Sequence, residues 1–201
     1  MLIGAGLGSS ASICVVILRS LAEITGKNLD AKTIARLGNQ LERRFHGNPS
    51  GLDTAVVAME RVISFRKNDV PKTISIQRVS GQRPWRFALI DSGLRSSTIA
   101  MINKAKPYFT SADGDKRIAR FDELATQVET GLGDGVEAQV ADAMNDAGAM
   151  LHEAGVCGDK LAEIIETSRG LGVLGAKPTG AGGGGCVLAL LDSTVATQQL
   201  K

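Results

Sequence analysis

The stretch Gly4–Ser10 combines three glycines with two serines, and the apolar run Ile13–Leu18 follows it closely. Glycine lets a backbone turn tightly and approach a ligand because it has no Cβ atom. A helix that starts after such a loop presents unpaired N–H groups and a partial positive charge. The pattern therefore predicts a cradle for phosphate groups at the start of the chain.

The hydroxyl of Ser10 could also ligate the Mg²⁺ that accompanies a nucleoside triphosphate. The simpler alternative is a glycine-rich turn in which Ser9 or Ser10 only caps the helix. The loop lacks the Gly-Lys-Ser/Thr ending of a Walker A motif. No apolar strand precedes it within this sequence, so it also lacks the context of a dinucleotide fingerprint.

Two carboxylates, Glu42 and Asp53, complete a chemical set with this loop. Phosphoryl transfer needs held phosphates, a placed Mg²⁺ and a carboxylate beside the attacking hydroxyl. Ser10 and Glu42 offer the oxygen ligands that Mg²⁺ prefers, which leaves Asp53 to orient or deprotonate an alcohol. The alternatives are a solvated helix residue for Glu42, beside Arg43 and Arg44, and a helix-capping role for Asp53.

Composition excludes several classes of function. The 201 residues carry a net charge of +2 with one Trp and one Tyr, which argues against a dedicated nucleic-acid surface. No apolar run reaches the roughly 18 residues of a membrane span, and the first residues lack the basic flank of a signal peptide. The three cysteines, Cys14, Cys157 and Cys186, lie in apolar surroundings and indicate reduced thiols. We therefore expect a cytoplasmic protein with no membrane or nucleic-acid partner.

The first third of the chain predicts helices. Apolar spacing indicates a helix over residues 9–25 with one apolar face, formed by Ile13, Val16, Ile17, Leu21 and Ile24. Asp30 is placed to cap a second helix, which the segment 46–49 ends at Pro49. A short helix then begins with a capping-box-like start at Ser50 and runs through Ala58.

The remainder mixes strands and helices. Strand-like runs cover residues 62–65, 74–79 and 87–91, and about four helical segments occupy 97–170. A second glycine run, Gly180–Gly185, leads into an apolar strand over 186–191. The lack of strict alternation favours an α+β fold. Polar residues cluster between about 78 and 86, so we expect domains at 1–80 and 81–201.

Three ordered motifs together resemble the GHMP kinase superfamily. They are Gly4–Ser12, Glu42 with His46–Asp53, and Lys177–Cys186. The Gly-Asn-Pro-Ser-Gly-Leu-Asp element within His46–Asp53 is most similar to that of the mevalonate kinases. Ser96–Thr98 also resembles a substrate-side segment of that group. The motifs span nearly the whole chain, which makes the resemblance far more specific than a single glycine loop.

The resemblance implies ATP-dependent phosphorylation of the C5 hydroxyl of mevalonate in isoprenoid biosynthesis. It implies an N-terminal part like the second domain of ribosomal protein S5 and a ferredoxin-like C-terminal domain. ATP and Mg²⁺ would be the cofactors, and a small molecule the substrate. A homodimer stays open.

The resemblance also assigns roles by position. The ATP phosphates would lie on the backbone of Gly6, Leu7, Gly8 and Ser9, next to Ser10. Ser10 and Glu42 would hold Mg²⁺, and Asp53 matches the catalytic aspartate. The substrate side would be formed by Thr98, Gly182, Gly183 and Gly184. Lys177 has counterparts in many members, and we assign it no catalytic role.

Family members carry a segment ahead of the phosphate loop, with several strands and a lysine paired with the catalytic aspartate. This sequence begins at Met1 within the approach to the loop, so we expect an N-terminally truncated chain with a partial first domain. Two alternatives remain open. One is a catalytically silent remnant that binds nucleotide, and the other is a related kinase acting on galactose or homoserine.

Overall fold

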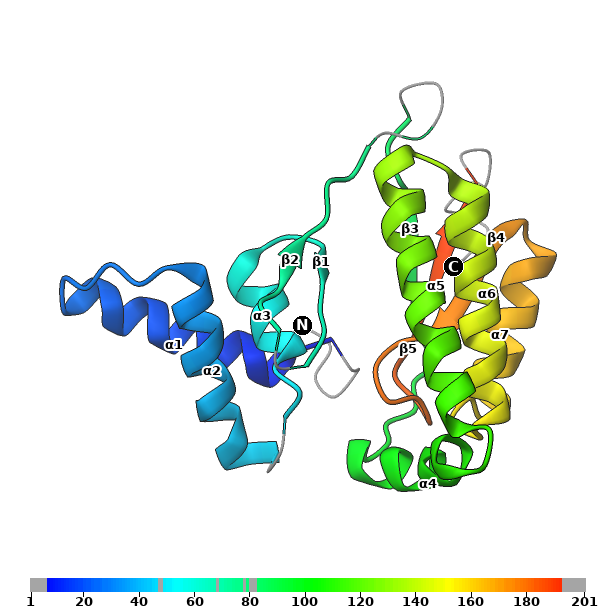
Figure 1. Ribbon diagram of the computed structural model, residues 1–201, viewed down its shortest axis with the longest axis horizontal. Helices are drawn as coiled ribbons and strands as arrows, with labels where there is room; N and C mark the ends of the chain where they lie inside the picture. The colour runs from blue at the N-terminus through cyan, green and yellow to red at the C-terminus, as the bar shows by residue number, and fades with distance from the viewer. Residues whose placement is uncertain (1–6, 47–48, 68, 78, 80–82, 193–201) are drawn as a thin grey trace. The chain divides into compact units, whose positions relative to one another are not determined.

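The computed structural model describes residues 7–46, 49–67, 69–77, 79 and 83–192 (Figure 1). The chain divides into two compact units, one spanning Leu7–Ile74 and the other starting at Ser75. Each unit is described by itself below. None of the helices in the described part of the chain has the length and apolar character that crossing a bilayer requires.

The first unit contains three helices and a small antiparallel strand pair. The elements are α1 (Ser9–Ile24), α2 (Ala31–His46), α3 (Leu52–Met59), β1 (Ile63–Ser64) and β2 (Lys72–Thr73). Val15, Ile34 and Ala58 form the centre of its core, one from each helix. The three helices thus pack mutually, and the predicted site residues lie at the starts of α1 and α3 and in the last turns of α2.

The buried face of α1 differs from the predicted one. Ala11, Cys14, Val15 and Ala22 are buried. The five predicted apolar residues share a face, but they remain 47–81% exposed: Ile13, Val16, Ile17, Leu21 and Ile24. The small side chains are the ones that face the partner helices because they allow α1 to pack closely against α2 and α3.

The starts of α2 and α3 follow different rules. The backbone N–H of Thr33 donates to the Asp30 carboxylate at 2.7 Å, which confirms Asp30 as the cap of α2. The capping-box prediction for α3 is wrong, because its N-cap is Gly51 with φ 89° and no side-chain cap. The Ser50 hydroxyl instead accepts from the N–H of Leu52 at 3.2 Å.

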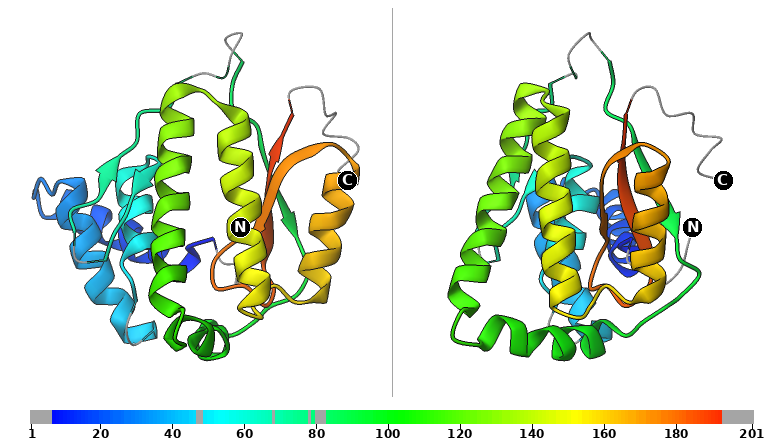
Figure 2. Two further views of the ribbon diagram at one scale, coloured as in Figure 1. Left: turned by 45° about the vertical axis from the view of Figure 1, so that its right-hand side comes forward. Right: turned by 90° about the vertical axis from the view of Figure 1, so that its right-hand side faces the viewer.

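The second unit contains a three-stranded antiparallel sheet and four helices (Figure 2). Its elements are β3 (Phe87–Asp91), α4 (Thr98–Thr110), α5 (Gly114–Asp134), α6 (Glu137–Glu153), α7 (Asp159–Gly170), β4 (Val173–Pro178) and β5 (Cys186–Leu191). The strand order is β3-β5-β4, with Asp91 opposite Cys186 and Pro178 opposite Val187. Leu161 and Ile165 of α7 pack on the sheet to form its main core.

Helix α6 runs along the outer edge of β4 and packs closely on it. The Asn145 side chain donates to the carbonyl of Leu174 at 3.0 Å and accepts from the N–H of Ala176 at 3.1 Å. A Cβ atom at Gly175 would lie 2.7 Å from the Cα of Ala141, so only glycine permits this approach. The side-chain amide thereby satisfies backbone groups that an edge strand leaves unpaired.

These elements confirm the predicted α+β class and the four helical segments between residues 97 and 170. The predicted strand over 74–79 is wrong. The N–H of Gln77 donates to the carbonyl of Leu132 at the end of α5 at 2.9 Å, and Val79 makes only an isolated bridge to Arg83. Strand β4 was not predicted at all.

Candidate active site

Gly8 starts the first part of the candidate site. It is the N-cap of α1 and adopts a left-handed conformation with φ 70° and ψ 30°. Its carbonyl accepts hydrogen bonds from the backbone N–H and the hydroxyl of Ser12, at 2.9 and 3.0 Å. The N-cap is therefore glycine, which excludes the reading of Ser9 or Ser10 as the capping residue. Leu7 is exposed, and Gly6 lies outside the described residues.

Ser10 and Glu42 are joined directly. The Ser10 hydroxyl, in the first turn of α1, donates to a carboxylate oxygen of Glu42 at 2.8 Å. Glu42, in the last turns of α2, is only 3% exposed although Arg43 and Arg44 beside it are exposed. The alternative of a solvated helix residue is thus wrong for Glu42.

The oxygen pair fits a magnesium ion. Two neighbouring ligands of an octahedral Mg²⁺ lie about 2.9 Å apart, close to the spacing between the Ser10 and Glu42 oxygens. Both are hard oxygen donors, and one carries a negative charge. A buried carboxylate that holds a single hydroxyl has lone pairs left for a cation.

The charge of Glu42 also reaches Cys14, one turn after Ser10 on α1. Burial raises the pKa of the Cys14 thiol, and the nearby Glu42 carboxylate raises it further. Cys14 is therefore held as a neutral thiol behind the oxygen pair. It acts there as a small apolar side chain.

Asp53 lies beside Gly8. A Cβ atom at Gly8 would sit 3.6 Å from the Asp53 Cβ and 3.8 Å from its carboxyl carbon. Asp53 occupies the first turn of α3, and it is exposed. The left-handed Gly51 sets the direction in which α3 begins, and in this direction Asp53 lies beside Gly8.

The second unit contains the other predicted site residues. Left-handed glycines shape its loop between β4 and β5: Gly180, Gly182, Gly183 and Gly185. A Cβ atom at Gly182 would lie 2.3 Å from the carbonyl oxygen of Val156, and one at Gly184 would lie 2.8 Å from that of Leu94. Here the glycines are required by neighbouring backbone as well as by conformation.

This loop is bonded to the segment that carries Thr98. The Ser96 hydroxyl donates to the carbonyl of Gly182 at 2.6 Å, and the N–H of Gly185 donates to that of Leu94 at 2.8 Å. Thr98 is the exposed first residue of α4, which Ser97 caps. The structure therefore brings Thr98 and the glycine-rich loop to one region of the second unit.

The predicted residues thus form two clusters. Gly8, Ser10, Glu42 and Asp53 meet in the first unit, and the second unit joins the 96–98 segment to Gly182, Gly183 and Gly184. The roles assigned to these residues remain predictions.

Two polar residues near these clusters were not found from the sequence. Asn39 lies one turn before Glu42, and a Cβ atom at Gly51 would be 3.1 Å from its Nδ2. Among the described residues, its buried Oδ1 has no hydrogen-bond partner. Ser96 was noted only as part of a resembling segment, and its bond to Gly182 could not be read from spacing.

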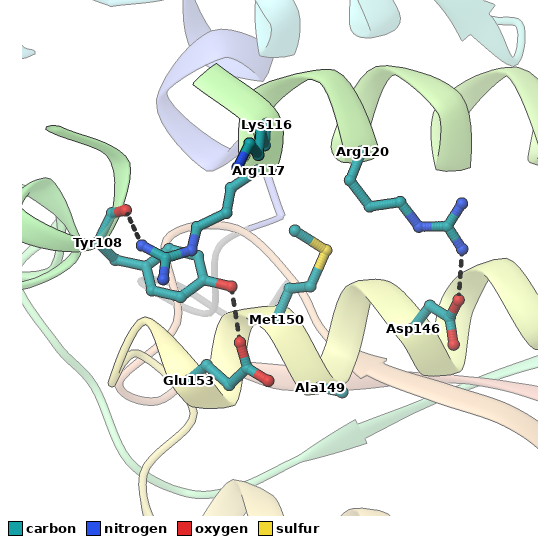
Figure 3. A pocket seen from close by; sticks show the side chains of 8 residues that line it. All are labelled: Tyr108, Lys116, Arg117, Arg120, Asp146, Ala149, Met150 and Glu153. Carbon is teal, nitrogen blue, oxygen red and sulfur yellow. Dashed lines mark hydrogen bonds and ion pairs between the residues drawn. The ribbon is translucent and has the colours of Figure 1, made fainter. Parts of the chain in front are cut away.

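A separate pocket of about 380 Å³ lies between α4, α5 and α6 in the second unit (Figure 3). Its charged groups are already paired. Tyr108 donates to Glu153 at 2.8 Å, Arg120 pairs with Asp146 at 2.7 Å, and the Arg117 guanidinium lies 4.0 Å from the Tyr108 ring centre. None of the predicted site residues lines it, and its network joins the three helices.

Comparison with known proteins identifies the family of this arrangement. A model of the GHMP kinases N terminal domain matches residues 1–61, and a model of the GHMP kinases C terminal region matches 131–201. The mevalonate kinase of Thermococcus onnurineus is 31% identical over 206 residues, covering 97% of this chain and 59% of that relative.

Solved structures show the same fold. L. major mevalonate kinase in complex with R-mevalonate matches with a TM-score of 0.86 at 24% identity, covering 100% of this chain and 61% of that one. Lactococcus lactis galactokinase complexed with galactose matches with a TM-score of 0.72 at 19% identity, covering 95% of this chain and 59% of that one.

The chain belongs to the GHMP kinase family. Both family regions are present in order, and the fold matches solved members over nearly the full chain. Several mevalonate kinases are among its curated relatives, and the chain spans 59% of the length of the Thermococcus onnurineus enzyme.

Proposed function

We propose that this chain carries the ATP-binding and phosphoryl-transfer residues of a mevalonate kinase. The observation that supports this most directly is the Ser10–Glu42 oxygen pair, close in sequence to the left-handed Gly8 that lies beside Asp53. Metal ligands, phosphate cradle and carboxylate are the three parts that phosphoryl transfer requires. The mevalonate kinases among the relatives support the choice of reaction.

In this proposal, the backbone of Gly6–Ser9 and the start of α1 bind the phosphates of ATP. The N–H groups in the first turn of a helix point along its axis and favour an anion there. Gly8 adopts the left-handed conformation that leads the chain into α1. Because it has no side chain, a phosphate can approach the backbone there. The binding needs no lysine from a Walker A motif.

Ser10 and Glu42 hold Mg²⁺ in the proposed site. When bound, the ion neutralises phosphate charge as the γ-phosphoryl group is transferred. The packing of α1 on α2 places the two oxygens, so the protein supplies the ligand geometry before the ion arrives. Because Glu42 is buried, water screens its charge little, and its attraction for a nearby cation is strong.

Asp53 orients the acceptor alcohol and takes its proton. As the hydroxyl oxygen forms a bond to the γ-phosphorus of ATP, the bond from that phosphorus to the bridging oxygen breaks and ADP leaves. The proton of the hydroxyl passes to the Asp53 carboxylate. Thr98 and the loop glycines Gly182, Gly183 and Gly184 contribute the substrate side.

Mevalonate is the proposed acceptor. The His46–Asp53 element and the mevalonate kinases among the relatives favour it over galactose or homoserine. The likeness to a galactokinase shows the fold alone and does not move this choice. Such an enzyme would work in the cytoplasm, as the reduced cysteines suggest.

The proposal is tested with a coupled assay for ADP release using mevalonate, galactose and homoserine as acceptors. We expect ADP release with mevalonate when the segment that precedes the phosphate loop in family members is joined to this chain. Asp53→Asn should lower kcat by about 10²–10⁴-fold, the scale of a positioned acid or base, and change ATP affinity much less. Asp69→Asn, an exposed carboxylate of the same unit, is the matched control.

Each outcome bears on one part of the proposal. Turnover with another alcohol would show that mevalonate is not the acceptor, while the proposed kinase activity would stand. Binding of an ATP analogue without turnover on any acceptor would favour a silent nucleotide-binding protein. Full turnover by Asp53→Asn would remove Asp53 from its assigned role.

A further inference from the structure

Lys177 is a half-buried cation that the proposed reaction does not use. It is the penultimate residue of β4, and its ammonium donates to the carbonyl oxygen of Pro178 at 2.9 Å. Burial lowers the pKa of Lys177. Within the described part of the chain, no carboxylate lies at ion-pair distance from this ammonium.

The surroundings of Lys177 are closely packed. A Cβ atom at Gly148 of α6 would lie 3.5 Å from the Lys177 Cβ and 3.1 Å from the carbonyl oxygen of Ala176. Across the sheet Lys177 pairs with Leu188 of β5. Among the described residues, the one hydrogen-bond partner of this ammonium is the Pro178 carbonyl, and a partly buried cation with so little compensation costs stability.

The accepting carbonyl marks the point where β4 ends and the glycine-rich loop begins. Thr179 closes the base of that loop, because its N–H and its hydroxyl both donate to the carbonyl of Cys186, at 2.9 and 3.0 Å. Lys177 therefore acts on the peptide group directly before this closure.

A loop this rich in glycine needs several hydrogen bonds to hold it in one conformation. Glycine loses more conformational freedom on ordering than any other residue. The far side of the loop is held by the N–H of Gly183, bonded to Val156 at 2.6 Å, and that of Gly185, bonded to Leu94 at 2.8 Å. On the β4 side, the Lys177 ammonium makes the corresponding hydrogen bond, to the Pro178 carbonyl.

We propose that Lys177 is a positioning residue, whose ammonium holds the Pro178 carbonyl and so fixes the path of the loop 179–185 as it leaves β4. The inference rests on the proposed function only in giving this loop a ligand to contact. The half-buried cation lowers the stability of the unit, and its bond to the Pro178 carbonyl restricts the loop to a single conformation.

Amide hydrogen exchange of the whole chain, measured by NMR without any ligand, tests this. Lys177→Met should speed exchange about tenfold at the N–H groups of Thr179, Gly183 and Gly185, the loss expected for one hydrogen bond. The N–H of Leu191, bonded to Arg86 at 2.9 Å, and the amides of α7 serve as controls and should not change.

Thermal unfolding supplies a second readout that moves in the opposite direction. Lys177→Met replaces a partly buried ammonium with an apolar side chain of similar length, so the unfolding temperature should rise. Lys177→Gln keeps a donor and should hold loop exchange within about threefold of the parent chain. A residue that served only packing would loosen the loop and lower the unfolding temperature together.

Several results would overturn the proposal. They are unchanged loop exchange in Lys177→Met, equal acceleration in the control amides, a Gln variant as loose as the Met variant, or failure of Lys177→Met to fold. Because no ligand or turnover is measured, failure here leaves the kinase proposal untouched, and failure of the acceptor assay leaves this one untouched.

Discussion

The hydroxyl of Ser10 donates to the carboxylate of Glu42 at 2.8 Å, although 32 positions separate them in sequence. The bond joins the first turn of α1 to the last turns of α2. The two helices are therefore locked in the register that places both oxygens together. A shift of α2 by one residue would rotate Glu42 by about 100° and remove it from Ser10.

Glu42→Gln should lower the pKa of the Cys14 thiol. The carboxylate charge is one cause of the raised pKa, and the neutral amide removes it while burial remains. The ¹³Cβ shift of Cys14 followed with pH measures this. Cys157, whose pKa is raised by burial alone, should not change. An unmoved Cys14 pKa would show that the Glu42 charge does not reach it. In turnover, the same variant should need more Mg²⁺.

Gly8→Val should abolish binding of a fluorescent ATP analogue. A Cβ at Gly8 makes only ordinary contacts, so the constraint is its φ of +70°, which a β-branched residue resists. Gly26 is a matched control, since it has φ +65° and open space around it. Gly26→Val should cost similar strain and keep affinity. Unchanged affinity in Gly8→Val would reject the phosphate cradle.

The helices and the site motifs were predictable because each is a local pattern. Gly4–Ser10, Glu42 and Asp53 carry chemistry in their types, and Asp30 carries a capping signal. The buried side of α1 was not predictable in the same way. Hydrophobicity alone selects Ile13 over Ala11, whereas close helix packing favours the smaller residue.

Gly182→Ala should destabilise the second unit by about 1–3 kcal/mol, the usual cost of a strained backbone or a clash. Its Cβ would meet the Val156 carbonyl oxygen at 2.3 Å, and its φ is +81°. Gly93→Ala has a similar φ of +72° in open space and isolates the cost of conformation. Denaturant unfolding compares them. Equal losses would mean that the contact with Val156 adds nothing.

The pair formed by Asp91 and Arg95 should give the second unit a pH-dependent stability. Two hydrogen bonds from Arg95, with one from the N–H of Gly93, lower the Asp91 pKa to about 2 from the model-compound value of 3.8. A lowered carboxyl pKa stabilises the fold above pH 3.8, and that contribution disappears as the pH falls through about 2. Denaturant unfolding of Asp91→Asn should therefore differ from the parent at pH 5 and converge near pH 2. A constant difference would exclude this cause.

The exposed side chains on α1 should drive association of the isolated chain. Ile13, Val16 and Ile17 are 59%, 60% and 47% exposed on one helix face. Contiguous apolar surface of this kind promotes contact between chains. Ile17→Glu should shift size-exclusion elution toward the monomer. Ile118→Glu, on an α5 residue that is 48% exposed, should not. Identical elution of the parent chain, Ile17→Glu and Ile118→Glu would show that α1 does not form the contact between chains.

The strand errors have a common physical origin. Residues 74–79 have strand-like side chains, but the N–H of Gln77 finds its acceptor at the end of a helix. In β4, Gly175 and Lys177 interrupt the apolar pattern; close packing on α6 explains the glycine, and the lysine bonds to the Pro178 carbonyl. The partner of each backbone group lies far along the chain, and local composition does not encode it.

The Asn145 side chain, which bonds to Leu174 and Ala176 of β4, limits where the sheet of the second unit can be extended. The outer side of β4 already has its peptide groups engaged by a helix, so another strand cannot add there. Among the described elements, β3 is the other edge strand of this sheet, since it pairs with β5 and with no further strand. Within the described part of the chain, a strand that extends this sheet by β-augmentation would therefore pair along Phe87–Asp91.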